Sequence, residues 1–185
     1  DARPQGRDGR NDRQIAQMKP GWAGEEIRAG GGSIGPEPTW SKAPRLLAGA
    51  MGPTSIERSA QWADGLYAWS GNGETEELQR TFAMAEAAWD RADREQKPYR
   101  MGGFWYTFAN DGQRKLYDYV YEYLAIAGPE IATMMAESVH RSTTDAVMEA
   151  LDNAEAAGCE ELFMVPATAE LVEVEALLEL LARRG

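Results

Sequence analysis

The chain has 185 residues, of which 43% are hydrophobic, and 30 Asp and Glu against 19 Lys and Arg give it a formal net charge of −11. This length and apolar content are enough for the core of one folded domain, which argues against a disordered chain. The acidic charge disfavours nucleic acid and anionic lipid surfaces as partners, because both are bound through clustered cations.

The first residues carry charges and no long apolar run. The sequence contains no stretch of roughly 20 apolar residues that would span a membrane, and residues 1–13 lack the apolar run of a signal peptide. We therefore expect a cytoplasmic protein. Cys159 is the single cysteine and His140 the single histidine, which excludes an intrachain disulfide and a metal site built from Cys and His ligands of this chain.

Residues 1–44 differ in composition from the rest of the chain. A triple-glycine run and four prolines predict a loop-rich segment. Within it, Ile15 and Met18 lie at helical spacing and predict one short helix over 12–18, which should end before Pro20.

From residue 45 onward, strand and helix patterns alternate. A short apolar run predicts a strand over 45–50, and Ile56, Ala60 and Ala63 at helical spacing predict the helix after it. A second strand is predicted over 65–69. The next helix, over 74–94, carries Leu78, Phe82, Ala85 and Trp89 on one face.

The second part of the chain continues this alternation with a helical interruption. An aromatic-rich strand is predicted over 100–108, where the pair Gly102-Gly103 indicates a kink or a close approach of backbones. The elements predicted after it are helices over 113–127, 129–140 and 143–157, a strand over 160–165 and a final helix over 168–184. Strands that alternate with helices predict an α/β fold with parallel strands, either in an open doubly wound sheet or in a barrel.

Four stretches of the sequence carry a family resemblance. Arg45–Trp69 combines a strand, a turn of small residues and a helix that closes on Ala63-Asp64-Gly65, and it resembles a segment of the bacterial-luciferase-like flavin-dependent monooxygenases. Gly158–Thr168, Phe108–Tyr117 and Gly21–Ile27 are similar to further segments of that family, in the same order.

The resemblance implies a (β/α)8 TIM-barrel fold. Residues 45–185 would supply about the last four β/α units, the C-terminal half of the barrel, together with an inserted helical region. Residues 1–44 would precede them as the loop-rich segment. The chain departs from the family pattern in that units one to four are absent and Lys19-Pro20 interrupts a normally continuous helix.

The turn after the first strand is the predicted cofactor site, because ligands of such barrels bind at the C-terminal ends of the strands. Its glycines permit close approach of a ligand to the backbone, although an ordinary strand-to-helix turn explains the same residues. The resemblance implies that the turn holds a flavin phosphate. The residues that would do so are Gly49, Ala50, Met51, Gly52, Thr54 and Ser55.

Other candidate site residues are weaker. Trp69, Ser70 and Trp105 are candidates for a substrate pocket, while turn formation and core packing are the alternative roles. His140 is interpreted as a solvated histidine and Cys159 as an inert core residue. No catalytic residue and no metal ligand is nominated.

The resemblance implies a flavin-dependent oxidoreductase that uses reduced FMN and oxygen on a small organic substrate, with a flavin reductase as a candidate partner. One alternative is hydride transfer from a reduced deazaflavin. Another is a non-catalytic flavin-binding or partner subunit. Proteins of this appearance are usually homodimers, which we also expect here.

Overall fold

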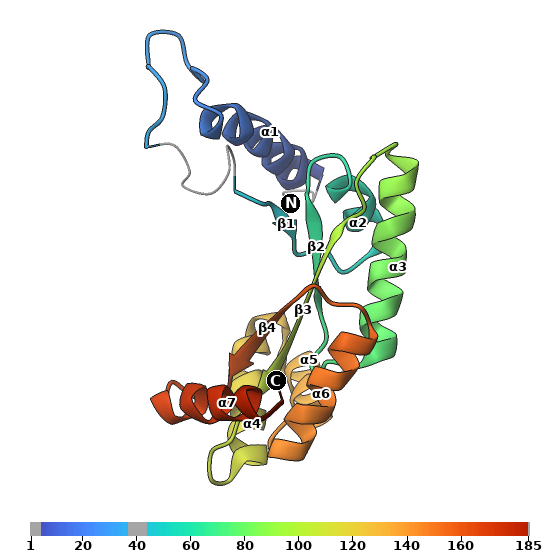
Figure 1. Cartoon of the computed structure of the whole chain (residues 1–185), viewed down its shortest axis with the longest axis vertical. Coiled ribbons are helices and arrows are strands. Elements are labelled where there is room, and N and C mark those ends of the chain that lie inside the picture. The colour runs from blue at the N-terminus through green and yellow to red at the C-terminus, as the bar shows by residue number, and fades with distance from the viewer. Residues whose placement is uncertain (1–4, 37–43, 185) are drawn as a thin grey trace.

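The computed structural model describes residues 5–36 and 44–184. The chain forms four strands and seven α-helices within this part, with one short 3₁₀-helix (Figure 1). The elements in chain order are α1 (Gln5–Trp22), β1 (Leu47–Ala48), α2 (Pro53–Ser59), β2 (Gly65–Trp69), α3 (Thr75–Arg91), β3 (Tyr99–Tyr106), α4 (Gly112–Leu124), η1 (Ala125–Ala127), α5 (Pro129–Ser138), α6 (Thr144–Ala156), β4 (Glu161–Pro166) and α7 (Leu171–Arg184).

The four strands form one parallel sheet in the order β1-β2-β3-β4. Leu66 pairs with Arg100, and Met101 pairs with Glu161, so that neighbouring strands start at the same edge. The predicted α/β fold with parallel strands is therefore confirmed. Sequential strand order is the order of a barrel, whereas a doubly wound sheet reverses direction at a switch point.

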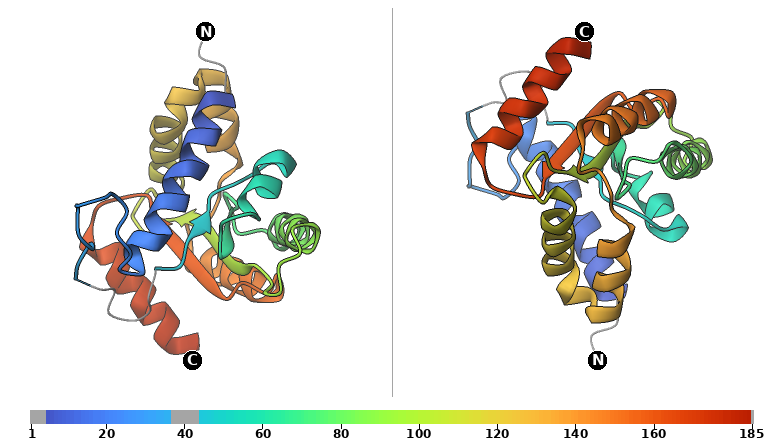
Figure 2. Two further views of the ribbon diagram at one scale, coloured as in Figure 1. Left: turned by 90° about the horizontal axis from the view of Figure 1, so that it is seen from above. Right: turned by 90° about the horizontal axis from the view of Figure 1, so that it is seen from below.

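The convex face of the sheet is covered by helices. Figure 2 shows α2, α3, α6 and α7 following one another in an arc around this side, while α4 and α5 lie on the other side. Leu66 packs with Ile56 and Trp89 between the sheet and α2 and α3, and Phe104 packs with Val147 under α6. These side chains supply the main core, because even-numbered positions of β2 and β3 point to the same face.

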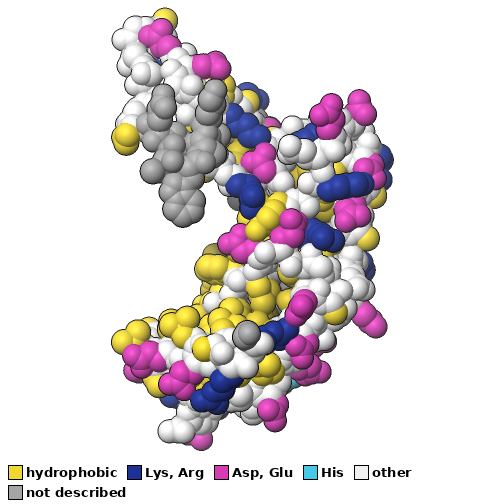
Figure 3. Space-filling model, in the orientation of Figure 1, with side chains coloured by type: hydrophobic (Ala, Val, Ile, Leu, Met, Phe, Trp, Pro, Cys, Tyr) yellow, Lys and Arg dark blue, Asp and Glu magenta, His cyan; other side chains and the backbone are white. Residues whose placement is uncertain are grey.

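The concave face of the sheet is apolar and less covered. The aromatic rings of Tyr67, Trp69 and Trp105 lie along it, with contacts from Trp69 to Tyr67 and to Trp105 at centroid distances of 6.0 and 4.5 Å. Phe163 of β4 lies on the same face and remains 54% exposed. Figure 3 shows hydrophobic side chains gathered in the hollow of the molecule. The C-terminal end of this face is covered by the inserted region, through residues of α4 and α5.

Two predicted elements have different bounds in the structure. The predicted helix over 12–18 is part of a longer helix, α1, that continues through Pro20 and ends at Trp22. Tertiary contacts hold α1 in place, since Ile15 is buried and Lys19 Nζ donates a hydrogen bond to the carbonyl oxygen of Trp62 at 2.6 Å. Pro20 lacks one helical N–H, and the helix ends two residues later.

The first strand is shorter than predicted. Of the predicted 45–50, only Leu47 and Ala48 pair with β2, because the chain turns away from the sheet from residue 49 onward. The bounds of β2, Gly65–Trp69, are the predicted ones. The division of the chain at residues 44 and 45 stays a prediction.

Gly103 of β3 lies where backbones approach closely, as predicted, while Gly102 lies against side chains. A Cβ atom on Gly103 would lie 2.9 Å from the backbone oxygen of Phe163, and one on Gly102 would lie 2.8 Å from Cys159 Sγ. Side chains at these positions would push β3 away from β4.

Candidate functional site

The turns that follow β1 and β2 lie side by side at the C-terminal edge of the sheet, because the two strands are parallel neighbours. Between these turns and α3 lies a pocket of about 260 Å³. Three predicted site residues, Ala50, Met51 and Trp69, line it together with Gly71. The remaining walls come from α3 and α5, with Glu77, Arg80, Thr81, Met84 and Met135.

The turn after β1 lies at the C-terminal edge of the sheet. Ser55 Oγ donates a hydrogen bond to the Gly52 oxygen at 2.8 Å and accepts one from the Gly52 N–H at 3.2 Å. The hydroxyl of Ser55 is thus used inside the turn, and Thr54 and Ser55 are both exposed. A Cβ atom on Gly49 would meet nothing within 4 Å, so the backbone there is open to a ligand.

The turn after β2 is held in place by hydrogen bonds. Ser70 Oγ donates to Glu77 Oε2 at 2.7 Å and accepts from the Glu74 N–H at 2.9 Å. The side chain of Asn72 accepts a hydrogen bond from the His140 N–H at 2.9 Å. Ser70 is buried, and its hydroxyl is occupied by this turn. Its assignment to a substrate pocket stays a prediction.

The two predicted tryptophans occupy different surroundings. Trp105 is buried beneath α4 and α5, in a cluster with Leu116 and Val120. Trp69 lines the pocket, and its indole Nε1 is buried without a hydrogen-bond partner. A buried N–H without an acceptor costs about 1–3 kcal/mol, so a polar atom supplied by a ligand or by water would stabilise this position.

Arg80 is one of the pocket residues that the sequence did not predict, together with Glu77, Thr81, Met84 and Met135. No ion pair, hydrogen bond or ring contact joins its guanidinium to any other residue in the part of the chain that the structure describes. A single arginine on an acidic amphipathic helix is usually solvated. No sequence motif around Arg80 indicates that it lies at a pocket. Only the position of α3 against the two turns brings Arg80 to the pocket.

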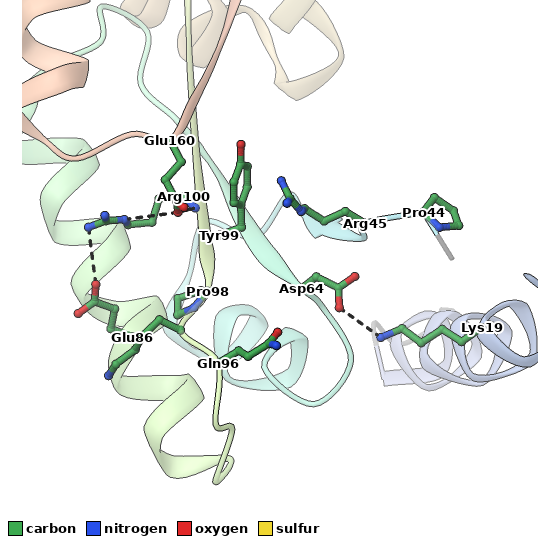
Figure 4. A pocket seen from close by; sticks show the side chains of 11 residues that line it. Lys19, Pro44, Arg45, Asp64, Glu86, Gln96, Pro98, Tyr99, Arg100 and Glu160 are labelled. Atoms are coloured by element: carbon green, nitrogen blue, oxygen red, sulfur yellow. Dashed lines mark hydrogen bonds and ion pairs between the residues drawn. The ribbon is translucent and has the colours of Figure 1, made fainter. Parts of the chain in front are cut away.

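A second cavity of about 840 Å³ lies at the opposite edge of the sheet, where the strands begin (Figure 4). Its charges compensate one another: Arg100 lies 3.9 Å from Glu86 and 3.8 Å from Glu160, and the Arg45 guanidinium stacks 3.7 Å from the Tyr99 ring centroid. In a barrel, residues at the N-terminal edge of the strands contribute to stability, whereas ligands bind at the C-terminal edge. We therefore assign the cavity a structural role, despite its larger size.

Two side chains with raised pKa values, Tyr67 and Cys159, are poor candidates for proton transfer. Burial, with a smaller contribution from Tyr123, raises the pKa of Tyr67 to about 12, and burial raises the pKa of Cys159 to about 11. Both groups stay protonated at neutral pH. His140 is exposed, with Nε2 3.9 Å from Glu74 Oε1. Among residues 5–36 and 44–184, no three His, Cys, Asp or Glu side chains gather to hold a metal ion, and no helix there is long and apolar enough to cross a membrane.

Residues 12–173 match the family described as luciferase-like monooxygenase. No curated protein matches the sequence. Solved structures match over large parts of the chain. The monooxygenase RslO1 from Streptomyces bottropensis is 20% identical, with a TM-score of 0.57, over 93% of this chain and 58% of its own.

Two further solved structures are named for coenzyme F420. The coenzyme F420 dependent tetrahydromethanopterin reductase from Methanopyrus kandleri is 12% identical, with a TM-score of 0.57, over 82% of this chain and 56% of its own. An F420-dependent secondary alcohol dehydrogenase, solved with an F420-acetone adduct, is 14% identical, with a TM-score of 0.50, over 68% of this chain and 44% of its own. At these identities the matches establish a shared fold, and the chain spans about half the length of these structures.

Proposed function

The chain belongs to the luciferase-like monooxygenase family, and we propose that it supplies the C-terminal half of a (β/α)8 barrel that binds a flavin or deazaflavin at its mouth. The observation that carries this proposal is the position of the turn over 49–55. It follows a parallel strand at the C-terminal edge of the sheet, is exposed at Gly49, Met51 and residues 53–55, and borders a pocket. Cofactors of barrel enzymes bind at this edge.

The leading function is a flavin-dependent oxidoreductase that acts on a small organic substrate. Reduced FMN, when bound, would supply the electrons for transfer of an oxygen atom from O₂ to the substrate. The chain's own contribution would be binding and orientation. The open backbone at Gly49 would approach the phosphate, while the side chains of Met51 and Trp69 would offer apolar surface and exclude water.

A deazaflavin-dependent hydride transfer is the second candidate. It is favoured by the solved structures, two of which are named as F420-dependent proteins. The pocket beside the turn would serve either cofactor, because both carry a phosphate group on a flexible chain.

A non-catalytic role, as a flavin-binding or partner subunit, is favoured by a different observation. The concave sheet face exposes Phe163 and leaves Tyr67 beside it partly exposed, and a partner subunit could cover this surface. The expected homodimer, the flavin reductase partner and the cytoplasmic location stay predictions.

Calorimetric titration of the chain with oxidised FMN, reduced FMN and coenzyme F420 tests the proposal. We expect one of these ligands to bind with a dissociation constant in the low micromolar range or below. Absence of binding heat with all three would contradict both enzyme functions, and the partner-subunit role would then be the remaining candidate.

A further inference from the structure

We propose that Met51, in the turn after β1, is the residue of this chain that hydrogen peroxide oxidises first, and that its sulfoxide changes the pocket between the two strand-end turns and α3. The modification concerns the side chain itself and needs no bound cofactor. The inference therefore goes beyond the proposed function and can be tested without it.

Met51 is the most exposed of the eight methionines of the chain. It is 76% exposed, compared with 60% for Met134 and 42% for Met18, and the other methionines are only partly exposed. A thioether reacts with a peroxide wherever the reagent reaches the sulfur atom, since no proton has to leave first. Access therefore favours oxidation of Met51.

The neighbours of Met51 in the chain are held in place and keep the residue at the surface. Ala50, which precedes it, is buried in the core under α2. Gly52, which follows it, donates its N–H to Ser55 Oγ at 3.2 Å, and its carbonyl oxygen accepts hydrogen bonds from Ser55 Oγ at 2.8 Å and from the Ile56 N–H at 3.0 Å. The exposure of Met51 is thus a consequence of how the turn is built.

Cys159 is the other sulfur that a peroxide attacks, and its surroundings protect it. The reactive form of a cysteine is the thiolate. Burial raises the pKa of Cys159 to about 11, so that at pH 7 only about one molecule in 10,000 carries the thiolate. The thioether of Met51 has no such requirement, and we expect it to react before the thiol.

The reaction is an oxygen transfer with water as the second product. A lone pair of Met51 Sδ attacks one oxygen atom of hydrogen peroxide, and the O–O bond breaks. That oxygen atom becomes the sulfoxide oxygen, and the other leaves as water with both hydrogen atoms. The sulfur atom loses two electrons and the peroxide gains them. Methionine sulfoxide reductases reverse such a modification.

Oxidation of Met51 would make one wall of the pocket polar. Met51 lines the pocket together with Trp69, Met84 and Met135, which give it apolar and polarisable surface. A sulfoxide oxygen accepts hydrogen bonds, whereas a thioether sulfur accepts them only weakly. The buried indole N–H of Trp69 has no hydrogen-bond partner in the described part of the chain, so this ring is the neighbour that we expect to respond.

Peptide mapping by mass spectrometry tests the site of oxidation. The folded chain is treated with dilute hydrogen peroxide at pH 7 and quenched with free methionine, and the gain of one oxygen atom is followed at each sulfur. We expect Met51 to react first, at least about fivefold faster than Met84 and Met135. In denaturing urea all methionines should react at similar rates. Earlier oxidation of another methionine or of Cys159 in the folded chain would overturn the inference.

The indole N–H resonances of the isotope-labelled chain test the effect on the pocket. Trp69→Phe identifies the signal of Trp69, which should shift when the unaltered chain is oxidised and stay in place when Met51→Leu is oxidised. Met134→Leu is the matched control, because Met134 is also exposed but lines a different cavity, and its oxidised form should show the same shift as the unaltered chain. A Trp69 signal that does not move after full oxidation of Met51, or that moves equally in Met51→Leu, would overturn the inference.

Discussion

Arg141 Nη2 donates a hydrogen bond to Glu74 Oε1 at 2.9 Å, which joins the segment after α5 to the turn that follows β2. The Arg141 side chain is 1% exposed, and its other donors are used by Asn72 O at 2.7 Å and by Glu149 Oε2 at 2.5 Å. A buried guanidinium is stable only when its charge and donors are satisfied, as they are here. The turn beside the candidate pocket is thereby held by a distant part of the chain.

Arg141→Met should lower the free energy of unfolding by about 2–4 kcal/mol, because backbone and carboxylate acceptors lose a buried partner. Urea denaturation measures the change. Arg91→Met is the control, since the ion pair of Arg91 with Glu57 is exposed and screened by solvent, so its loss should change the stability little. Equal stability of the two variants would show that the buried network contributes no more than a surface ion pair.

Glu173 anchors the start of α7 to the end of β3. Its carboxylate accepts hydrogen bonds from Thr107 Oγ1 at 2.5 Å, from the Phe108 N–H at 2.6 Å and from Thr168 Oγ1 at 3.0 Å, and the residue is fully buried. Glu173→Ala leaves these donors without an acceptor and should cost about 2–4 kcal/mol in urea denaturation.

Glu173→Gln should cost less than Glu173→Ala, since the amide oxygen still accepts. Glu179→Ala on the exposed face of α7 should change stability by no more than about 0.5 kcal/mol. A loss as large in Glu179→Ala would indicate that the buried hydrogen bonds of Glu173 do not account for the effect.

Gly103→Ala should destabilise the sheet by about 1–3 kcal/mol, because the new Cβ atom would lie 2.9 Å from the backbone oxygen of Phe163. Thermal unfolding followed by circular dichroism measures the change. Gly49→Ala is the control, since a Cβ atom there has nothing within 4 Å, and its unfolding temperature should be close to that of the unaltered chain. A tolerated Gly103→Ala would mean that β3 and β4 separate easily.

The thiol of Cys159 should react slowly with a disulfide reagent at pH 8. Burial raises its pKa from 9.0 to about 11 in the folded chain, so the thiolate fraction is about 100-fold lower than in the unfolded chain. Since a more basic thiolate is also more nucleophilic, the net slowing expected from the pKa is about tenfold. Comparison of the reaction rates without and with denaturing urea checks this.

The same shift predicts a dependence of stability on pH. A thiol whose pKa is raised on folding stabilises the protein fully below pH 9, and this contribution is lost as the pH rises toward 11. Cys159→Ala should remove that part of the alkaline loss of stability. An unchanged pH profile in this variant would assign the loss to other groups.

The exposed apolar surface predicts self-association of the chain. Leu178 of α7 is 60% exposed and Phe163 of β4 is 54% exposed, at the edge of the sheet where a barrel would continue. Light scattering should detect species larger than a monomer, and Leu178→Glu should reduce their amount, because a charge disfavours burial of that surface. A monodisperse monomer of the unaltered chain would contradict the expectation of a homodimer.

The helices and strands with strong periodicity could be predicted from the sequence. The buried face of α3 was identified from Leu78, Phe82 and Trp89, which lie one or two helical turns apart, and the bounds of β2 followed from its apolar run. The place of the turn after β1 was also predictable, because alternating strands and helices put all C-terminal strand ends at one edge. These features depend on neighbours in the sequence.

The remaining features were decided by contacts between distant residues. The length of α1 depends on the contact of Lys19 with Trp62, which lies 43 residues later, and the burial of Arg141 depends on Asn72, 69 residues earlier. Arg80 borders a pocket only because α3 packs beside the two turns. Local periodicity specifies which face of an element is apolar. The elements that fold against that face decide which polar side chains are desolvated, which are paired and which are left free. No local pattern in the sequence specifies these contacts, because they join residues that are far apart in the chain.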